Sequence, residues 1–202
     1  MMETEELFGL PKGKEVEEVL AQLHLHIETL GVNVVDDFSA PNHARFVGIF
    51  DDNTITLYPN SAPSFARWFT IAHLYGHMIQ LLNKTPRVER ANTLVLRLGE
   101  TLTPDDVQLI YDHEREAAEI GRKLVAVANP TLSLGMDKAY NRFFHADFHY
   151  LINVIETAES GTDLFALYWK REPVPREVIV PDSRSLVDMK QMPMSDDCII
   201  VV

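Results

Sequence analysis

The chain has 202 residues, of which 46% are hydrophobic and 24% are charged, proportions typical of an ordinary globular protein. Its length fits one sizeable domain, alone or with a small appendage. The 18 basic and 30 acidic side chains give a formal net charge of −12, which argues against binding to the phosphate backbone of a nucleic acid. Such an acidic surface fits solubility and is compatible with a basic protein partner.

Three features of the sequence bear on its location. The single cysteine, Cys198, excludes an internal disulfide framework and fits a reducing compartment, and we expect it to be an inert residue of a terminal strand. The acidic residues 1–6 lead into no long apolar run, so they do not form a signal peptide. No uninterrupted apolar segment approaches the roughly 20 residues that a membrane span requires. We therefore predict a cytoplasmic protein with no membrane partner.

The first predicted element is an amphipathic helix that ends before Gly31. Its apolar residues recur at intervals of three and four: Val16, Leu20, Leu23, Ile27 and Leu30. Glycine is common just past a helix end because it adopts a positive φ without strain. His24 and His26 lie two positions apart on this helix and point in different directions, so we expect them at its surface or boundary, without a metal role.

The next predicted elements are three short strands and a second helix. The strands are the β-rich runs 32–35, 46–50 and 54–58. The last two flank residues 51–53, which tolerate tight backbone geometry, so they predict a β-hairpin. The second helix begins near Pro63, because proline suits the first helical turn.

Residues 83–102 include a β-prone run, 93–98, which we interpret as a strand. The helix that follows has a strong start: Thr103 supplies a hydroxyl N-cap, a proline occupies the first position, and two acids lie in the first turn. It runs to about Ala128, where an Asn-Pro pair ends it.

A further helix is predicted at about residues 136–157, with an apolar stripe formed by Tyr140, Phe144, Phe148, Leu151 and Ile155. The tail beyond Gly161 has prolines at positions 173, 175, 181 and 193. They exclude long regular elements, so we expect an extended arm that lies over the domain or is partly mobile. Residues 198–202 are apolar enough to pack as a strand. We thus divide the chain into a domain at 1–158 and a C-terminal extension at 159–202.

The chemistry of the chain centres on two histidines, His73 and His77, in the apolar run 68–80. Four-residue spacing on a helix places both imidazoles on one face, one turn apart, so that both reach a single metal ion. The run differs by one residue from the zinc-peptidase pattern H-E-x-x-H, because Leu74 occupies the position of the glutamate.

A peptidase site of this kind needs a third protein ligand and an open position for water. The segment 111–121 offers candidates on a helix that can pack against the first. Glu114 shares a face with three small residues that permit close helix approach: Ala117, Ala118 and Gly121. Glu114 is therefore the predicted third ligand, with Glu116 as the fallback. Glu116 and Glu119 lie off that face, and we expect both to be solvated.

Four segments carry a likeness to a known family, in the family's order. They are the helix end at 30–34, the hairpin at 47–57, the string Phe69-Thr70-Ile71-Ala72-His73-x-x-Gly76-His77, and the run Glu114-x-Glu116-Ala117 that leads to Asn129-Pro130. The string around the histidines is the specific one. On these segments, which cover roughly residues 14–130, the chain resembles the ImmA/IrrE family of zincin-type metallopeptidases.

The resemblance implies an α+β fold, in which a zincin-like domain packs a small antiparallel sheet or hairpin on several helices. It also implies a zinc ion held by His73, His77 and Glu114, and repressor-type transcription factors as substrates or partners. The ligand types alone also suit iron or manganese. Residues 131–202 match no part of the family's catalytic core.

Two features depart from the family pattern. The interval from His77 to Glu114 is longer than usual, which suggests an insertion near residues 84–102. The larger departure is Leu74, at the position of the glutamate that takes a proton from the zinc-bound water and passes it to the leaving amine. We therefore assign no catalytic residue, since losing a general base costs about 10²–10⁴ in rate. The metal site need not be lost, because Leu74 is not a ligand.

Three interpretations follow. In the preferred one, the chain is a degenerate, non-catalytic ImmA/IrrE-like domain that acts as a regulatory or protein-binding module, with or without its metal. In the alternative, it is an active zinc metallopeptidase that cleaves a repressor-type partner, with water activated by another group such as Tyr111 or Asp112. In the third, the two histidines of the motif are ordinary core residues.

A second histidine pair, His145 and His149, repeats the four-residue spacing on the next helix. It lies beside the aromatic stripe, where a helix needs a boundary between apolar and polar faces, so we expect a structural role. The alternative is that His145, Asp147 or His149 borders the cleft and contacts a metal or a substrate.

Overall fold

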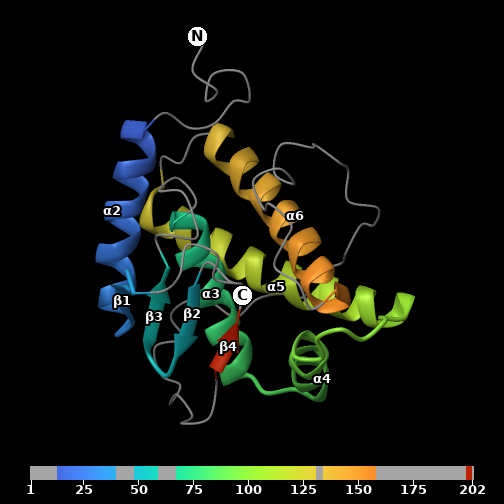
Figure 1. The fold of residues 1–202 in the computed structure, drawn as a ribbon. Coiled ribbons are helices and arrows are strands. Elements are labelled where there is room, and N and C mark those ends of the chain that lie inside the picture. Colours follow the sequence, from blue (N-terminus) through green and yellow to red (C-terminus); the bar gives the residue numbers. More distant parts are fainter. Residues whose placement is uncertain (1–12, 40–47, 59–66, 131–133, 158–198, 202) are drawn as a thin grey trace.

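Helix α3 (Arg67–Leu82) is the central element of the fold, because its residues from Trp68 to Leu81 are all buried. This computed structural model describes residues 13–39, 48–58, 67–130, 134–157 and 199–201, so the predicted helix start near Pro63 lies outside them. The architecture is α+β and mostly helical (Figure 1). The other elements are α2 (Gly13–Thr29), β1 (Asn33–Asp36), β2 (Gly48–Asp51), β3 (Thr54–Leu57), α4 (Pro86–Val95), α5 (Pro104–Ala128), α6 (Leu134–Thr157) and β4 (Ile199–Val201).

Helix boundaries are confirmed where local capping chemistry sets them. Helix α2 ends before Gly31, whose φ is +81°. At the start of α5, the Thr103 hydroxyl accepts a hydrogen bond from the backbone N–H of Asp106, and the Asp106 carboxylate accepts one from the backbone N–H of Thr103. This helix ends at Ala128, as predicted. The predicted aromatic and aliphatic stripe of α6 is buried along its length.

The strands form one mixed sheet in the order β1-β3-β2-β4. The predicted hairpin is confirmed, since β2 and β3 are antiparallel with Gly48 opposite Leu57, and Asp52 has a φ of +49° in the turn. The expectation of an antiparallel sheet is wrong for β1, which pairs in parallel with β3, with Asn33 opposite Thr54. Alternation within a run identifies a strand but not its neighbour, and β1 pairs with the edge of β3 that the hairpin leaves open.

Strand β4 confirms part of the predicted terminal strand. It pairs antiparallel with β2, with Ile199 opposite Asp51 and Val201 opposite Ile49. Cys198 and the rest of the predicted arm, residues 159–198, lie outside the described part of the chain.

The strand predicted at residues 93–98 is wrong, because the first part of this run belongs to helix α4. Thr85 caps that helix by accepting a hydrogen bond from the backbone N–H of Val88, and a proline occupies its first turn. Apolar residues at helical spacing are buried where α4 packs on α5: Val88, Ala91, Leu94 and Val95. This helical face outweighs the β-prone composition of the run.

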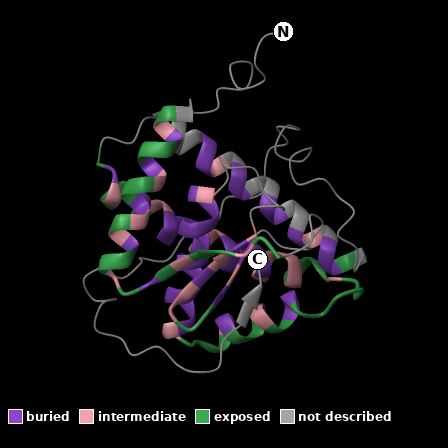
Figure 2. Ribbon diagram, turned by 60° about the vertical axis from the view of Figure 1, so that its left-hand side comes forward, coloured by how far each residue is buried: buried purple, intermediate pink, exposed green. Residues whose placement is uncertain are grey.

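Helices α3 and α5 approach closely through small residues, as predicted. A side chain on Gly76 would bring its Cβ within 2.0 Å of the carbonyl oxygen of Ala117, and one on Gly121 within 2.3 Å of that of Ala72. Only glycine permits such a separation. Helix α3 also contacts β2, β3 and α2, and Figure 2 shows the buried residues gathered at this centre. None of the described helices combines the length and hydrophobicity that crossing a membrane requires.

Candidate metal centre

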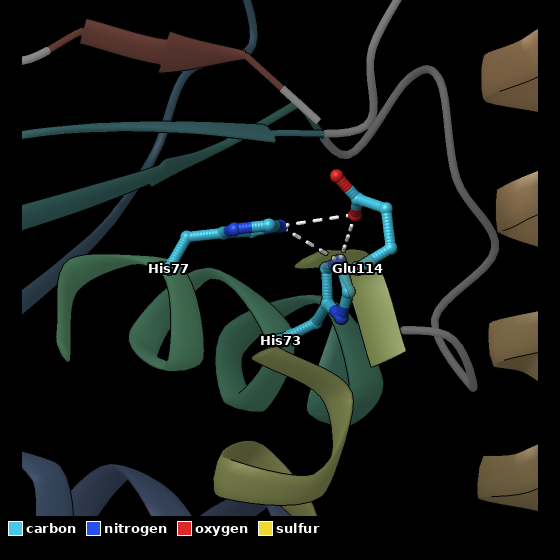
Figure 3. Close-up of side chains that lie close together, drawn as sticks. All are labelled: His73, His77 and Glu114. Carbon is cyan, nitrogen blue, oxygen red and sulfur yellow. Dashed lines mark hydrogen bonds and ion pairs between the residues drawn. The ribbon is translucent and has the colours of Figure 1, made fainter. Parts of the chain in front are cut away.

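Helices α3 and α5 bring together the three predicted ligand side chains. His73 and His77 lie one turn apart on α3, Glu114 faces them from α5, and all three are buried (Figure 3). Glu114 Oε2 lies 3.0 Å from His73 Nε2 and 3.1 Å from His77 Nε2, and the two Nε2 atoms are 3.1 Å apart. These three atoms form a nearly equilateral triangle, which we call the donor triangle.

Hydrogen bonds alone leave at least one edge of the donor triangle unfavourable. If both imidazoles carry a proton on Nε2, both donate to Glu114, and two N–H groups then face each other across the third edge. If only one carries a proton there, the other Nε2 presents a lone pair to the carboxylate oxygen. A single cation satisfies all three lone pairs, and ligand atoms of a tetrahedral zinc site lie roughly 3.3 Å apart. The donor triangle therefore fits a metal ion.

Gln80 orients His77 for such a role. Its Nε2 atom donates to the backbone carbonyl of His113 at 2.8 Å and to Glu116 Oε2 at 3.1 Å. Its Oε1 atom therefore faces His77 Nδ1 at 2.9 Å, and this nitrogen carries the proton. The lone pair of the neutral imidazole is then on Nε2, within the donor triangle. Glu116, the fallback ligand, thus supports Gln80 and is not part of the triangle.

His73 has a different environment. Its ring stacks on that of Phe69, with centroids 5.3 Å apart, and its Nδ1 atom is buried without a hydrogen-bond partner among the described residues. Asp147 of α6 also approaches it, with Oδ2 3.9 Å from His73 Nε2. Asp147 is thus the member of the second predicted cluster that the structure places at the site. The side chains of His145 and His149 are outside the described set.

Burial and close charges set the protonation of this cluster. Burial alone would raise the pKa of Glu114, but the charge of His77 and hydrogen bonds to both imidazoles hold that pKa well below its usual value. Burial lowers the pKa of His73, whereas the carboxylate of Glu114 outweighs burial at His77 and raises its pKa. Burial, reinforced by repulsion from Glu114, raises the pKa of Asp147 to about 7. The negative charge of Asp147 is therefore poorly compensated.

Leu74, at the position of the general base, is fully buried in the hydrophobic core. It faces the sheet, because a Cβ on Gly48 of β2 would lie 3.1 Å from Leu74 Cδ1. The missing side chain of Gly48 leaves room for this methyl group. The turn of α3 that carries both histidines therefore offers ligand atoms without a proton acceptor beside them.

The alternative bases considered from the sequence have other contacts. The Tyr111 ring packs against those of Phe144 and Phe148. Asp112 accepts a hydrogen bond from Gln108 and lies 3.6 Å from an Arg87 nitrogen. None of these contacts involves the donor triangle. The two histidines of α2 are partly buried at the helix boundary, as predicted.

The expectation that Glu119 is solvated is wrong, since this side chain is buried. Arg115 Nη2 lies 2.5 Å from Glu119 Oε1, and Arg122 Nε donates to Glu119 Oε2 at 2.9 Å. Two guanidinium groups from its own helix therefore neutralise the charge and allow the burial.

Sequence reasoning missed two residues that line the site. Gln80 follows His77 by three positions, so helical spacing was the available signal for it. His113 directly precedes Glu114, and adjacent helical residues do not share a face, so spacing gave no signal for His113. His113 is buried, its ring centroid lies 5.0 Å from that of His77, and burial lowers its pKa to about 3. It is therefore a neutral neighbour of the donor triangle.

No family model, curated protein or solved structure matches this chain. The chemistry of the site therefore rests on its side chains. Within the described residues, His73, His77 and Glu114 form the one group of three His, Cys, Asp or Glu residues whose donor atoms lie close enough to share an ion. Two imidazoles and a carboxylate suit zinc, iron or manganese. The structure thus contains a buried cluster that can hold a metal ion.

Proposed function

We propose that the chain is a degenerate ImmA/IrrE-like zincin domain that binds zinc through His73, His77 and Glu114 and does not cleave peptides. It acts as a regulatory module that recognises a protein partner, and a transcriptional repressor is the class that the resemblance favours. The donor triangle supports the metal, because hydrogen bonds alone leave one of its edges unfavourable and a single cation satisfies all three atoms. The buried Leu74 supports the absence of catalysis.

Each residue of the site has a part in this function. His73 and His77 of α3 and Glu114 of α5 hold the metal ion, whose positive charge neutralises the carboxylate and links the two helices. Gln80 holds the His77 ring with its Nε2 lone pair directed at the ion. Leu74 fills the space between α3 and β2 with hydrocarbon, where an active peptidase of this type would need a carboxylate.

Metal content and peptide turnover, measured on the same preparations, test the proposal. After zinc loading and gel filtration, we expect one zinc per chain by elemental analysis, and none in the His73→Ala, His77→Ala double variant. His24→Ala is the matched control, because it removes a partly buried histidine of α2, and it should retain the wild-type zinc content. Zinc-free wild type would refute the metal site, and full occupancy of the double variant would place the ion elsewhere.

The zinc-loaded chain should not cleave repressor-type proteins or unstructured peptides. Leu74→Glu supplies the missing carboxylate, with Leu74→Gln as a control of the same size and no base. Cleavage that appears only in Leu74→Glu would show that the wild type is inactive because it lacks the general base, which accounts for about 10²–10⁴ in rate. Turnover by the wild type that Glu114→Ala abolishes would overturn the non-catalytic assignment and establish the active metallopeptidase.

A further inference from the structure

Asp147 is a buried carboxylate with few polar contacts among the described residues. It lies on α6 and is 5% exposed. Within the described part of the chain, its one ion-pair contact is the 3.9 Å approach of Oδ2 to His73 Nε2, which is too long for a hydrogen bond. Removing a carboxylate from water costs several kcal/mol unless a charge or hydrogen bonds compensate it. The position of Asp147 beside the donor triangle therefore requires an explanation.

We propose that Asp147 is the fourth protein ligand of the metal ion and closes the site that His73, His77 and Glu114 begin. This inference rests on the proposed metal-binding function and extends it to a third helix. Asp147 Oδ2 lies 3.9 Å from His73 Nε2, about 0.6 Å more than the roughly 3.3 Å between ligands of a tetrahedral zinc site. Asp147 is outside the group of donor atoms that all lie within 4.8 Å of one another, so its side chain must rotate toward the donor triangle to bind the ion.

Charge balance supports this assignment. Two neutral imidazoles and two carboxylates carry two negative charges, which one divalent cation neutralises. With the donor triangle alone, Asp147 would remain a second buried anion close to Glu114. Among the described residues, no Lys or Arg forms an ion pair with Asp147. A metal ion bound by both carboxylates removes the repulsion between Glu114 and Asp147, because its two positive charges neutralise both.

A fourth protein ligand also agrees with the proposed absence of hydrolysis. Structural zinc sites use four protein ligands, whereas catalytic sites use three and keep one position for water. The side chains of the donor triangle and of Asp147 are all buried, and Leu74 supplies no base. A closed site would link α3, α5 and α6, and its metal would stabilise the helical part of the fold.

Cobalt(II) in place of zinc tests the closed site in the full-length wild-type chain. Four protein ligands give an intense tetrahedral visible spectrum that excess azide leaves unchanged. Asp147→Ala should open one position, so azide should change the spectrum of this variant. An azide response in the wild type would overturn the proposal without any variant, because it would show an exchangeable fourth position.

Zinc affinity gives an independent readout. Asp147→Asn keeps the size of the side chain and should weaken zinc binding by about 100-fold or more, since losing even an outer-shell partner costs 10–100-fold. Asp112→Asn is the control, because it removes an aspartate of α5 whose recorded contacts are with Gln108 and Arg87, and it should bind as the wild type does. Wild-type affinity in Asp147→Asn would overturn the fourth ligand and leave the donor triangle intact. Loss of zinc from the wild type itself would instead refute the metal-binding function.

Discussion

Helix α5 buries two glutamates, Glu114 and Glu119, whose surroundings differ in one respect. Glu119 is held by the guanidinium groups of Arg115 and Arg122, which carry permanent positive charge. Glu114 contacts the imidazoles of His73 and His77, which carry a positive charge only when they are protonated. The charge of Glu119 is neutralised within its own helix, whereas under the proposed function a bound metal ion would neutralise that of Glu114.

The comparison separates a structural carboxylate from a candidate ligand. A carboxylate that is buried for packing reasons recruits Arg or Lys, because these residues supply both charge and several hydrogen bonds. A carboxylate that is buried opposite two converging imidazole nitrogens has instead the partners that zinc uses. Burial alone therefore does not identify a candidate metal ligand. The neighbouring side chains do, because imidazoles point to a metal site and guanidinium or ammonium groups point to a structural ion pair.

The largest expected effect is the loss of zinc-dependent stability in Glu114→Gln. At a free zinc concentration about 1,000 times the Kd, the wild type should gain about 4 kcal/mol in the free energy of unfolding. Glu114→Gln should lose most of this gain, because the amide is a poor ligand that leaves the ion's charge uncompensated. Glu119→Gln should keep the whole gain. Urea unfolding with and without zinc measures both variants, and equal gains in both would refute the distinction between the two glutamates.

The next largest effect concerns the support of His77. Gln80→Leu removes the oxygen that accepts from His77 Nδ1, so the ring loses its preferred tautomer and orientation. We expect zinc affinity to fall about 10–100-fold, or about 1.4–2.7 kcal/mol. Asn83→Leu is the matched control. It removes an amide that lies just beyond the end of the same helix and donates to the backbone carbonyl of Ile79. Titration with a competing chelator gives both affinities, and an equal loss in the two variants would exclude a specific role for Gln80.

The features that could be predicted from the sequence are those that local spacing decides. The ends of α2 and α5 follow from Gly31 and Thr103, because caps act within one turn. His73 and His77 share a face by helical geometry, and the small residues of α5 indicated which glutamate would face them. Local chemistry therefore gave the three members of the donor triangle.

The features that the sequence did not reveal depend on contacts between distant segments. The parallel pairing of β1 with β3 is a choice of neighbour, which no alternation pattern encodes. The burial of Glu119 depends on packing around α5 as well as on the arginines that flank it in sequence. The sequence offered Asp147 only as one alternative beside His145 and His149. Which of them approaches His73 depends on how α6 packs, which is a tertiary contact.

The smallest expected effect is the loss of stability in Glu119→Gln without zinc. This change replaces a carboxylate that two guanidinium groups contact, and Arg122 is 40% exposed, so solvent screens part of the interaction. We expect the free energy of unfolding to fall by about 1–2 kcal/mol. A double-mutant cycle with Arg122→Gln should give a positive coupling energy, because the two side chains are in contact. Zinc affinity should stay at the wild-type value, since Glu119 is not part of the donor triangle. A fall in zinc affinity without a change in stability would reverse the roles that we assign to the two glutamates.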